Sequence, residues 1–310
     1  MYDIVIIGAG PAGLGAAIYA MRANMKTLVI EKIASGGQVM KTNDVDNYPG
    51  FYNNPTGEEL SEALYKHAEK FGIEIVKENV KVIENAEFDV KVVHTRHHKY
   101  TTKSIIFATG ASPKKLGVEG EAELGGSGVS YCAHCDGAFF KGKDVAVIGG
   151  GNTACEDAIY LSKLCRTVYL INRSKRFRAT ASVFENVKRY GNIKIITDTV
   201  CEKFNGTMQL QDIDIKNTQN GERSKLAVNG AIVAIGITPE SKLAADCGVE
   251  LCDYGFIKTD IYMRTNIKGI FAVGDVRTTP LRQIITAAAD GAVGAVSAST
   301  YVSEMGLKTV

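Results

Sequence analysis

Hydrophobic side chains dominate the start of the chain, and residues 4–21 include no charged residue. The β-branched residues 4–7 predict a buried strand, and the alanine-rich stretch that ends near residue 23 predicts a helix. Glycines and Pro11 interrupt the run, and no basic segment precedes it. We therefore interpret it as strand, turn and helix, and not as a membrane span or a targeting signal. Residues 27–31 predict the next strand.

The period of the hydrophobic pattern changes further along the chain. Residues 58–71 place apolar side chains at helical spacing and predict an amphipathic helix, whereas residues 73–107 alternate as short strands. Residues 269–276 predict a buried strand that ends in Gly274-Asp275. An acid at a strand end, beside a helix start, suits contact with a ribityl hydroxyl and a phosphate. The small residues of 284–300 predict a closely packed helix.

The opening pattern recurs 141 residues later, so that Gly8 aligns with Gly149, Gly10 with Gly151, and Gly13 with Ala154. Residues 144–172 therefore predict a second unit of strand, loop, helix and strand. The end of the first unit, residues 106–113, recurs as residues 232–239. Two related α/β units of the Rossmann-like, dinucleotide-binding kind explain this repeat.

The glycine loops are suited to dinucleotides. In a Gly-x-Gly-x-x-Gly loop the first glycine allows a tight turn, the second admits a pyrophosphate, and the third lets helix and strand pack closely. Glu31 ends the second strand at the position of a carboxylate that binds ribose hydroxyls. A purely structural glycine loop is the alternative interpretation, and the flanking strand, helix and acid disfavour it.

The second unit differs at the position equivalent to Glu31. Residues 172–178 carry the four cations Arg173, Lys175, Arg176 and Arg178 and no carboxylate. Cations at this point favour a 2′-phosphate, hence NADP over NAD. A solvated basic turn is the alternative.

Composition narrows the class of protein. With 45% hydrophobic and 23% charged residues, the chain is typical of a soluble globular protein, and its net charge of +2 gives no support to nucleic-acid or membrane-surface binding. Seven cysteines, an odd number, make a secreted disulfide framework improbable and favour a reducing, cytoplasmic setting.

The chemistry of the chain centres on Cys132 and Cys135, with Asp136 directly after them. A Cys-x-x-C pair alone indicates redox chemistry, half of a zinc site, or coincidence. With Cys247 and Cys252 it would complete a Cys₄ zinc site, but Cys-x₄-Cys is a loose spacing and Asp136 has no part in such a site. We expect no metal, and the position between two dinucleotide loops favours redox chemistry.

The ordered motifs resemble those of the low-molecular-weight thioredoxin reductases over essentially the full length of the chain. The matching segments are residues 8–13, 36–38, 47–50, 108–110, 130–137, the second glycine loop, 274–276 and 282–283. The resemblance implies an α/β fold of two Rossmann-like three-layer domains, the second inserted into the first. An FAD-binding domain would comprise residues 1–113 and 242–310, and an NADP-binding domain carrying the redox disulfide would comprise residues 114–241.

The resemblance also implies an electron path from NADPH through FAD and a Cys132–Cys135 disulfide to thioredoxin. Cys135 would face the flavin, Cys132 would exchange with the partner, and Asp136 would donate and accept the proton. The inserted domain would swivel about Pro113 and Pro239. Family members are usually homodimers.

The motifs and the resemblance together indicate the cofactor-binding residues. They are Gly8, Gly10, Pro11, Ala12, Gly13, Glu31, Gly37, Gln38, Asn47, Ala108, Thr109, Gly110, Gly274, Asp275, Arg282 and Gln283 for the first unit, and Gly149, Gly151, Asn152, Thr153, Ala154, Arg173 and Arg178 for the second.

The chain departs from the family in two places. The family's His-Arg-Arg-x-x-x-Arg segment is matched only by Arg173 and Arg178, which leaves ferredoxin as an alternative electron donor. His134 stands where threonine is usual; it is either a tolerated loop residue or a group that favours the Cys132 thiolate. A related reductase of another disulfide partner, and a nucleotide-binding redox sensor without turnover, are the competing functions.

Overall fold

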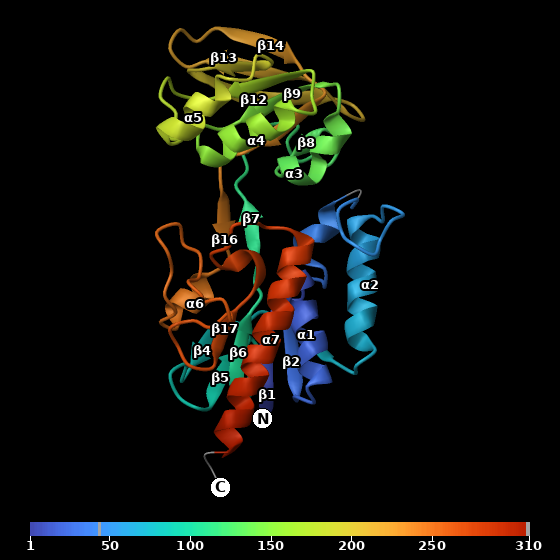
Figure 1. Ribbon diagram of the computed structural model, residues 1–310, viewed down its shortest axis with the longest axis vertical. Helices are drawn as coiled ribbons and strands as arrows, with labels where there is room; N and C mark the ends of the chain where they lie inside the picture. The colour runs from blue at the N-terminus through green and yellow to red at the C-terminus, as the bar shows by residue number, and fades with distance from the viewer. Residues whose placement is uncertain (43–44, 308–310) are drawn as a thin grey trace. The chain divides into compact units, whose positions relative to one another are not determined.

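The computed structural model describes residues 1–42 and 45–307 and divides into two compact units (Figure 1). The first unit comprises Met1–Ser112 and Thr238–Val310, and the second comprises Pro113–Ile237, inserted between these two segments. Each unit is built around a mainly parallel sheet, which confirms the predicted α/β class.

The sheet of the first unit has the strand order β3-β2-β1-β6-β5-β4, and β17 also pairs with β6. Its parallel part places Ile4 of β1 opposite Thr27 of β2 and Ser104 of β6, so the central strand is paired on both sides. The strands are β1 (Tyr2–Ile7), β2 (Thr27–Glu31), β3 (Glu74–Lys77), β4 (Val82–Glu84), β5 (Lys91–His94), β6 (Lys99–Phe107) and β17 (Ile270–Ala272).

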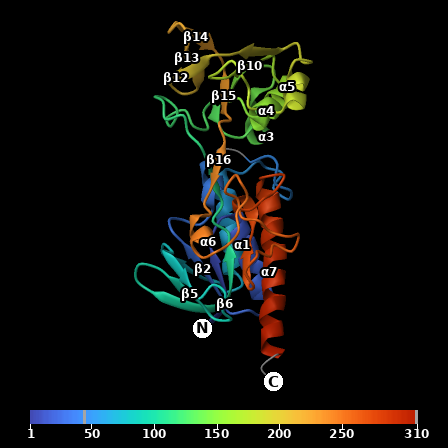
Figure 2. The same ribbon diagram turned by 90° about the vertical axis from the view of Figure 1, so that its left-hand side faces the viewer.

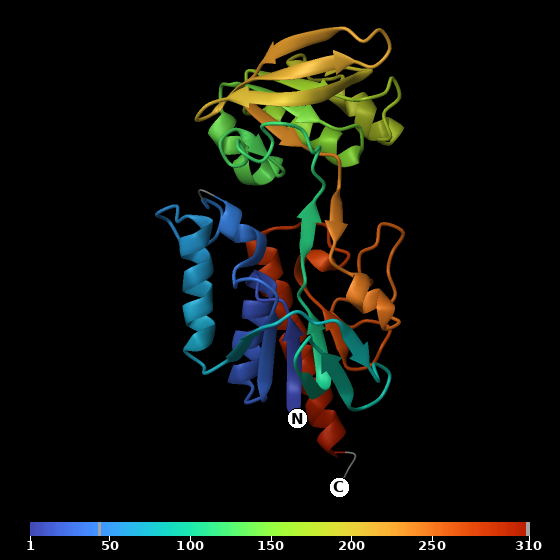
Figure 3. The ribbon, with the colours of Figure 1, turned by 180° about the vertical axis from the view of Figure 1, so that it is seen from behind.

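Alternate residues of β1 point to opposite faces of this sheet and form two cores. Ile4 and Ile6 belong to the core with the long helices, whereas Val5 and Ile7 pack with residues that include Ala244 and Val249. Figure 3 shows the unit from behind. The helical elements are α1 (Pro11–Arg22), α2 (Gly57–Glu69), α6 (Lys242–Asp246), α7 (Ile284–Leu307) and the 3₁₀ turns η1 (Gly37–Lys41) and η3 (Gly274–Val276).

Small residues allow α1 and α7 to lie side by side (Figure 1). A side chain at Gly291 would place its Cβ 2.2 Å from the carbonyl oxygen of Ala12, and one at Gly15 would reach 2.8 Å from that of Ala288. The predicted small-residue helix thus packs as expected, and it extends to Leu307.

The second unit has three layers. Its parallel sheet has the order β11-β10-β9-β15-β8, with helices on one face and a three-stranded antiparallel sheet, β12-β13-β14, on the other (Figure 2). The elements are β8 (Val129–Ser130), α3 (Ala133–Asp136), η2 (Gly137–Phe140), β9 (Asp144–Ile148), α4 (Asn152–Ser162), β10 (Thr167–Ile171), α5 (Ala181–Val187), β11 (Ile193–Ile196), β12 (Thr199–Gly206), β13 (Leu210–Asn217), β14 (Arg223–Ala227) and β15 (Gly230–Val233).

The chain passes between the units through β7 (Ala111–Pro113) and β16 (Ile237–Pro239), which pair as a two-stranded sheet. These strands come from the two copies of the sequence repeat. Hydrogen bonds from Lys114 N to Gly236 O and from Glu240 N to Gly110 O, each 2.9 Å, continue the pairing on either side.

The uncharged N-terminal run forms β1, a loop and α1, as predicted. In the part of the chain that the structure describes, no helix combines the length and apolar character needed to cross a membrane.

Candidate functional site

The first glycine loop joins β1 to α1, and its glycines meet different surroundings. At Gly8, where φ is +107°, a Cβ would lie 2.4 Å from the carbonyl oxygen of Ala108, and at Gly13 a Cβ would lie 1.9 Å from the carbonyl oxygen of Gly8. A Cβ at Gly10 would meet nothing nearer than the Cα of Gly37, at 4.0 Å. Gly8 and Gly13 are therefore required by the fold, whereas a Cβ at Gly10 would make only an ordinary van der Waals contact.

Gly10 lies at the start of α1. The N-cap residue, Gly10, has no side chain that could cap the helix, and Pro11 occupies the first turn. The remaining first-turn amides can therefore bind an anion. The Gly36 amide donates to the carbonyl oxygen of Ala9 at 2.8 Å, which holds the Gly36-Gly37 turn against the loop. The turn and the loop thus pack together at the start of α1, where backbone amides can bind an anion such as a diphosphate.

Glu31 lies beside the loop at the end of β2. Its Oε2 accepts from the Ala9 amide at 2.8 Å, and its Oε1 accepts from the Ile33 amide at 3.0 Å. Because each carboxylate oxygen can accept a second hydrogen bond, Glu31 can still bind ribose hydroxyls from this position.

Gly274-Asp275 comes from the far end of the chain and lies next to α1. A Cβ at Gly274 would be 2.8 Å from that of Ala12. Burial raises the pKa of the Asp275 carboxyl, and the Arg282 charge opposes this shift. Within the first unit, the two terminal segments of the chain therefore meet at one end of the sheet.

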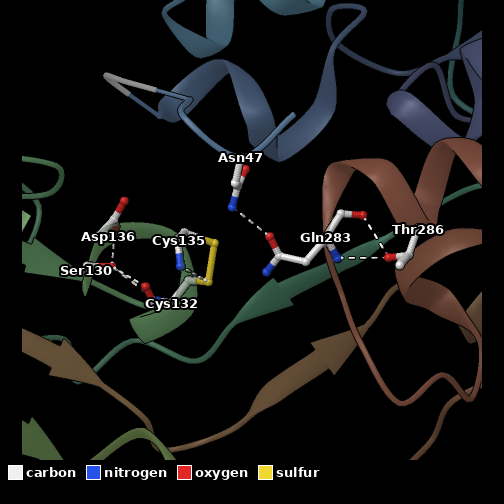
Figure 4. Close-up of a disulfide and its surroundings, with 7 residues drawn as sticks. All are labelled: Asn47, Ser130, Cys132, Cys135, Asp136, Gln283 and Thr286. Atoms are coloured by element: carbon white, nitrogen blue, oxygen red, sulfur yellow. Dashed lines mark hydrogen bonds between the residues drawn. A yellow bond between two sulfur atoms is a disulfide. The ribbon is translucent and has the colours of Figure 1, made fainter. Parts of the chain in front are cut away.

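Asn47 and Gln283, 236 residues apart in sequence, are also brought together. Asn47 Nδ2 donates to Gln283 Oε1 at 3.1 Å (Figure 4). The Arg282 guanidinium lies 4.1 Å from the centre of the Phe256 ring, and burial lowers its pKa. All four residues belong to the same unit as the first glycine loop.

Ala108, Thr109 and Gly110 follow β6, next to the carboxyl end of β1. Ala108 contacts Gly8, while Thr109 Oγ1 donates to the Glu240 carbonyl oxygen at 2.7 Å. Gln38 Nε2 donates to Ser112 Oγ at 3.1 Å. Gln38 thus contacts β7, and Thr109 contacts the residue that follows β16.

An ion pair that no motif indicates supports the Gly274 turn. Asp290 of α7 accepts from Arg277 Nε at 2.7 Å, from Arg277 Nη2 at 2.9 Å and from the Gly274 amide at 3.1 Å. Both side chains of the pair are only 13% exposed.

Replacing Arg277 with alanine is expected to destabilise the first unit by about 3 kcal/mol, because it leaves a largely buried carboxylate without its cation. Urea unfolding of the purified protein measures this loss. Lys242→Ala, which removes the exposed Lys242–Asp246 pair of the same unit, should cost less than about 1 kcal/mol. Equal effects of the two variants would contradict a structural role for Arg277.

The second glycine loop, between β9 and α4, repeats this design. A Cβ at Gly149 would lie 2.3 Å from the carbonyl oxygen of Ala234 and 2.9 Å from the Ala154 Cβ, which explains the small residue at position 154. A Cβ at Gly151 would meet nothing within 4 Å. Asn152 Oδ1 accepts from the Thr180 amide at 2.8 Å, and Thr153 is exposed in the first turn of α4.

The basic turn is folded around buried Asn172. Asn172 Nδ2 donates to the carbonyl oxygens of Ser174 at 2.7 Å and Arg176 at 3.2 Å. The Arg178 amide donates to the carbonyl oxygen of Gly150 at 2.7 Å. The turn is thereby held against the second loop. Its four cations are exposed, and within the described residues none of them forms an ion pair with a carboxylate: Arg173, Lys175, Arg176 and Arg178.

Cys132 and Cys135 form a disulfide at the start of α3, with their Cα atoms 5.3 Å apart. The Cys135 amide donates to Cys132 Sγ at 3.1 Å (Figure 4). Cys247 and Cys252 belong to the other unit and are free thiols. No cluster of three or more potential metal ligands occurs among the residues that the structure describes.

Asp136 and His134 lie on either side of Cys135 in sequence. Asp136 accepts a short hydrogen bond from Ser130, and the His134 ring lies 4.2 Å from the Tyr160 ring, centre to centre. His134 is exposed.

Three side chains near these sites were not predicted from the sequence. Ser130 and Asp290 support Asp136 and the Gly274 turn, and buried Asp157 lies in α4, where burial first and then Glu156 raise the pKa of its carboxyl to about 7. An acid inside the helix after a glycine loop is the one signal that could have indicated Asp157.

Two glycine loops between strand and helix, together with a Cys-x-x-Cys disulfide, are the features typical of a nucleotide-dependent disulfide oxidoreductase. A family model described as pyridine nucleotide-disulphide oxidoreductase matches residues 2–291, and the chain belongs to this family. Within it, the chain is a member of the low-molecular-weight thioredoxin reductases, which confirms the resemblance seen in the sequence.

The similarity extends over nearly the whole chain. The chain is 42% identical to the thioredoxin reductase of Bacillus subtilis (strain 168), over 98% of this chain and 96% of that protein. It is also 42% identical to the thioredoxin reductase of Peptoclostridium litorale, over 98% of both chains. The crystal structure of thioredoxin reductase from Streptococcus pyogenes MGAS5005 matches with a TM-score of 0.94 and 40% identity, over 98% of this chain and 99% of that one.

Proposed function

We propose that the protein is an FAD-dependent thioredoxin-disulfide reductase. It would couple the oxidation of a reduced pyridine nucleotide to the reduction of thioredoxin, through FAD and the Cys132–Cys135 disulfide. The observation that carries this proposal is the disulfide of α3, which shares a unit with the second glycine loop, in a chain whose other unit holds the first loop.

The first unit is assigned to FAD because its residues fit that group. The first-turn amides of α1 can bind a diphosphate, Glu31 is held where it can bind a ribose, and Asp275 with Arg282 and Gln283 belongs to the same unit. When bound, FAD supplies a two-electron acceptor that links a nicotinamide to a disulfide. The protein residues bind and orient it.

The roles of the two cysteines are assigned from a hydrogen bond within the redox ring, the small ring closed by the Cys132–Cys135 disulfide. The Cys135 amide donates to Cys132 Sγ, and a hydrogen bond to sulfur favours its thiolate form after reduction. Cys132 is therefore assigned to exchange with the partner and Cys135 to the flavin. Asp136, which directly follows Cys135 in the chain, is assigned as the proton donor and acceptor.

The second unit is assigned to NADPH because the basic turn offers exposed cations beside the second loop. Changing Arg173 and Arg178 together to alanine is expected to raise KM for NADPH by about 100-fold or more, since charge-assisted bonds to the 2′-phosphate contribute about 1.5–3 kcal/mol each. KM for NADH should change less than about twofold. Steady-state kinetics with both nucleotides measure the effect, and Lys188→Ala in the same unit is the control. An equal change for both nucleotides would refute a 2′-phosphate site.

An anaerobic titration tests the donor. The oxidised flavoprotein is titrated with NADPH, NADH or reduced ferredoxin while the flavin absorbance is followed. NADPH should bleach the flavin at the lowest concentration, and added thioredoxin should restore its colour. Bleaching by ferredoxin alone would reassign the donor and leave the rest of the proposal intact, an alternative that the incomplete cation motif keeps open.

The partner is tested separately. Insulin reduction coupled through the host's thioredoxins should proceed faster than turnover with a peroxide-reducing protein or a small dithiol. A cytoplasmic setting suits this chemistry, because a reducing compartment keeps cysteines such as buried Cys155 and Cys201 as thiols.

Catalysis requires two encounters that the inserted unit provides in turn. The unit that carries the disulfide also carries the second loop, and it is joined to the first through β7 and β16. We infer that it swivels about Pro113 and Pro239, so that nicotinamide and disulfide approach the flavin alternately.

A homodimer is also proposed. Ile285, Val293 and Val296 of α7 are 41%, 38% and 55% exposed and follow one another at helical spacing, which leaves an apolar stripe for a second copy. Sedimentation equilibrium of the holoenzyme checks this, and a monomer at micromolar concentration would contradict it.

A further inference from the structure

Ser130, the last residue of β8, lies between Asp136 and the backbone of Cys132. Its side chain belongs to a residue only 5% exposed. Ser130 Oγ donates a short hydrogen bond to Asp136 Oδ2, accepts from the Cys132 amide at 3.1 Å, and lies 3.4 Å from the Cys132 carbonyl oxygen (Figure 4). One hydroxyl thus contacts the proposed acid and both backbone groups of the proposed exchange cysteine.

The hydroxyl has a single proton, so it cannot serve both acceptors at once. When Asp136 is ionised, Ser130 donates to Oδ2. When Asp136 is protonated, its O–H can donate to Ser130 Oγ, and the Ser130 proton then turns to the Cys132 carbonyl oxygen. The direction of this short chain therefore depends on the charge of Asp136.

We propose that Ser130 is the positioning residue for Asp136: it links the carboxylate to the backbone of Cys132, favours its ionised form, and accommodates its protonation by turning to the Cys132 carbonyl oxygen. This inference rests on the proposed function, which assigns the proton transfer to Asp136. In this proposal Ser130 acts only through Asp136.

Ser130 would support the proton transfers that accompany thiol–disulfide exchange. In the reduced centre, Asp136 takes the proton of the Cys132 thiol. The Cys132 thiolate bonds to one sulfur of the partner disulfide, that disulfide breaks, and the second partner sulfur leaves as a thiolate that takes the proton from Asp136. Cys135, losing its proton by the same route, then attacks Cys132, which restores the ring and releases the first partner sulfur as a thiol.

Removal of the hydroxyl should therefore act through pH. A hydrogen bond to the charged form of an acid favours that form, so Ser130→Ala should make Asp136 easier to protonate. We expect the acidic limb of kcat/KM for thioredoxin to move to higher pH by about one unit. Activity should fall by up to roughly tenfold on the acidic limb of the wild-type profile and stay close to wild type on its plateau. Ser130→Thr, which keeps the hydroxyl, should restore the profile.

A double-mutant cycle separates positioning from a merely structural effect. If Ser130 acts through Asp136, Ser130→Ala combined with Asp136→Asn should be no slower than Asp136→Asn alone, within about twofold. Ser224→Ala, an exposed serine of the same unit, is the matched control and should leave every profile unchanged. Losses that add in the double variant, or a loss in Ser130→Ala that is equal at all pH values, would overturn the proposal.

A second measurement does not depend on thioredoxin. The enzyme is reduced with dithiothreitol, and the rate at which iodoacetamide alkylates Cys132 is followed against pH by mass spectrometry. Ser130→Ala should shift this profile when Asp136 is present and not in the Asp136→Asn background. No shift in either background would refute the role of Ser130, whereas a shift in an enzyme that fails to reduce thioredoxin would refute only the proposed function.

Discussion

Replacing Cys135 with serine is expected to abolish thioredoxin reduction, with a loss of about a thousandfold or more, while oxidation of NADPH by ferricyanide continues at the wild-type rate. The reason is that Cys132 and Cys135 form the disulfide through which electrons would leave the flavin, and cysteines 155, 165, 201, 247 and 252 are free thiols. A single thiol cannot cycle between dithiol and disulfide. Insulin-coupled turnover and ferricyanide reduction on one preparation measure both outcomes.

The same variant tests which cysteine performs the exchange. With Cys135 removed, Cys132 should hold oxidised thioredoxin in a mixed disulfide that survives non-reducing electrophoresis, because the resolving thiol is absent. Cys132→Ser should trap much less. Cys247→Ser is the control, since its sulfur donates to the Ala244 carbonyl oxygen and a hydroxyl can do the same. Stronger trapping by Cys132→Ser would reverse the two assignments.

The sequence predicts those parts of the molecule that depend on neighbouring residues. The glycine loops, the strands before them and the helices after them follow from local hydrophobic pattern and turn chemistry, and the repeat adds the second unit. The inserted arrangement follows from the resemblance alone. The antiparallel sheet that covers one face of the second unit has no local signal, because it depends on pairing between β12, β13 and β14.

The supporting residues were harder to predict because each depends on a contact specific to this fold. Asp290 holds Arg277 and Gly274 from a helix whose sequence shows only its small residues. Asn172 stands where an acid or histidine would bind a nucleotide, yet its side chain folds the basic turn from inside. Ser130 precedes Cys132 by two residues, and only the turn into α3 brings it to Asp136. Residue type at a motif position does not reveal such contacts.

The first glycine loop permits a prediction that separates folding from cofactor binding. Gly10→Ala should raise the dissociation constant for FAD by roughly 100-fold, equal to about 2.8 kcal/mol, while the apoprotein stays as stable as wild type within about 0.5 kcal/mol. Gly10 has φ −74° and ψ −176°, which alanine adopts freely, and its Cβ would meet the Gly37 Cα at 4.0 Å, an ordinary van der Waals contact. The methyl group would instead occupy the space assigned to the diphosphate. Fluorescence titration of the apoprotein with FAD measures the affinity, and urea unfolding measures the stability.

Gly13→Ala should behave in the opposite way. Its Cβ would lie 1.9 Å from the Gly8 carbonyl oxygen, so β1 and α1 must separate and the apoprotein itself should lose about 3 kcal/mol of stability. Gly191→Ala, where a Cβ meets nothing within 4 Å, is the control for both measurements. If Gly10→Ala binds FAD as tightly as wild type, the diphosphate does not occupy this loop, and the assignment of FAD to the first unit fails. The fold tolerates a methyl group at position 10 but not at position 13. A loss of FAD affinity in Gly10→Ala would therefore come from contact between the methyl group and the bound cofactor.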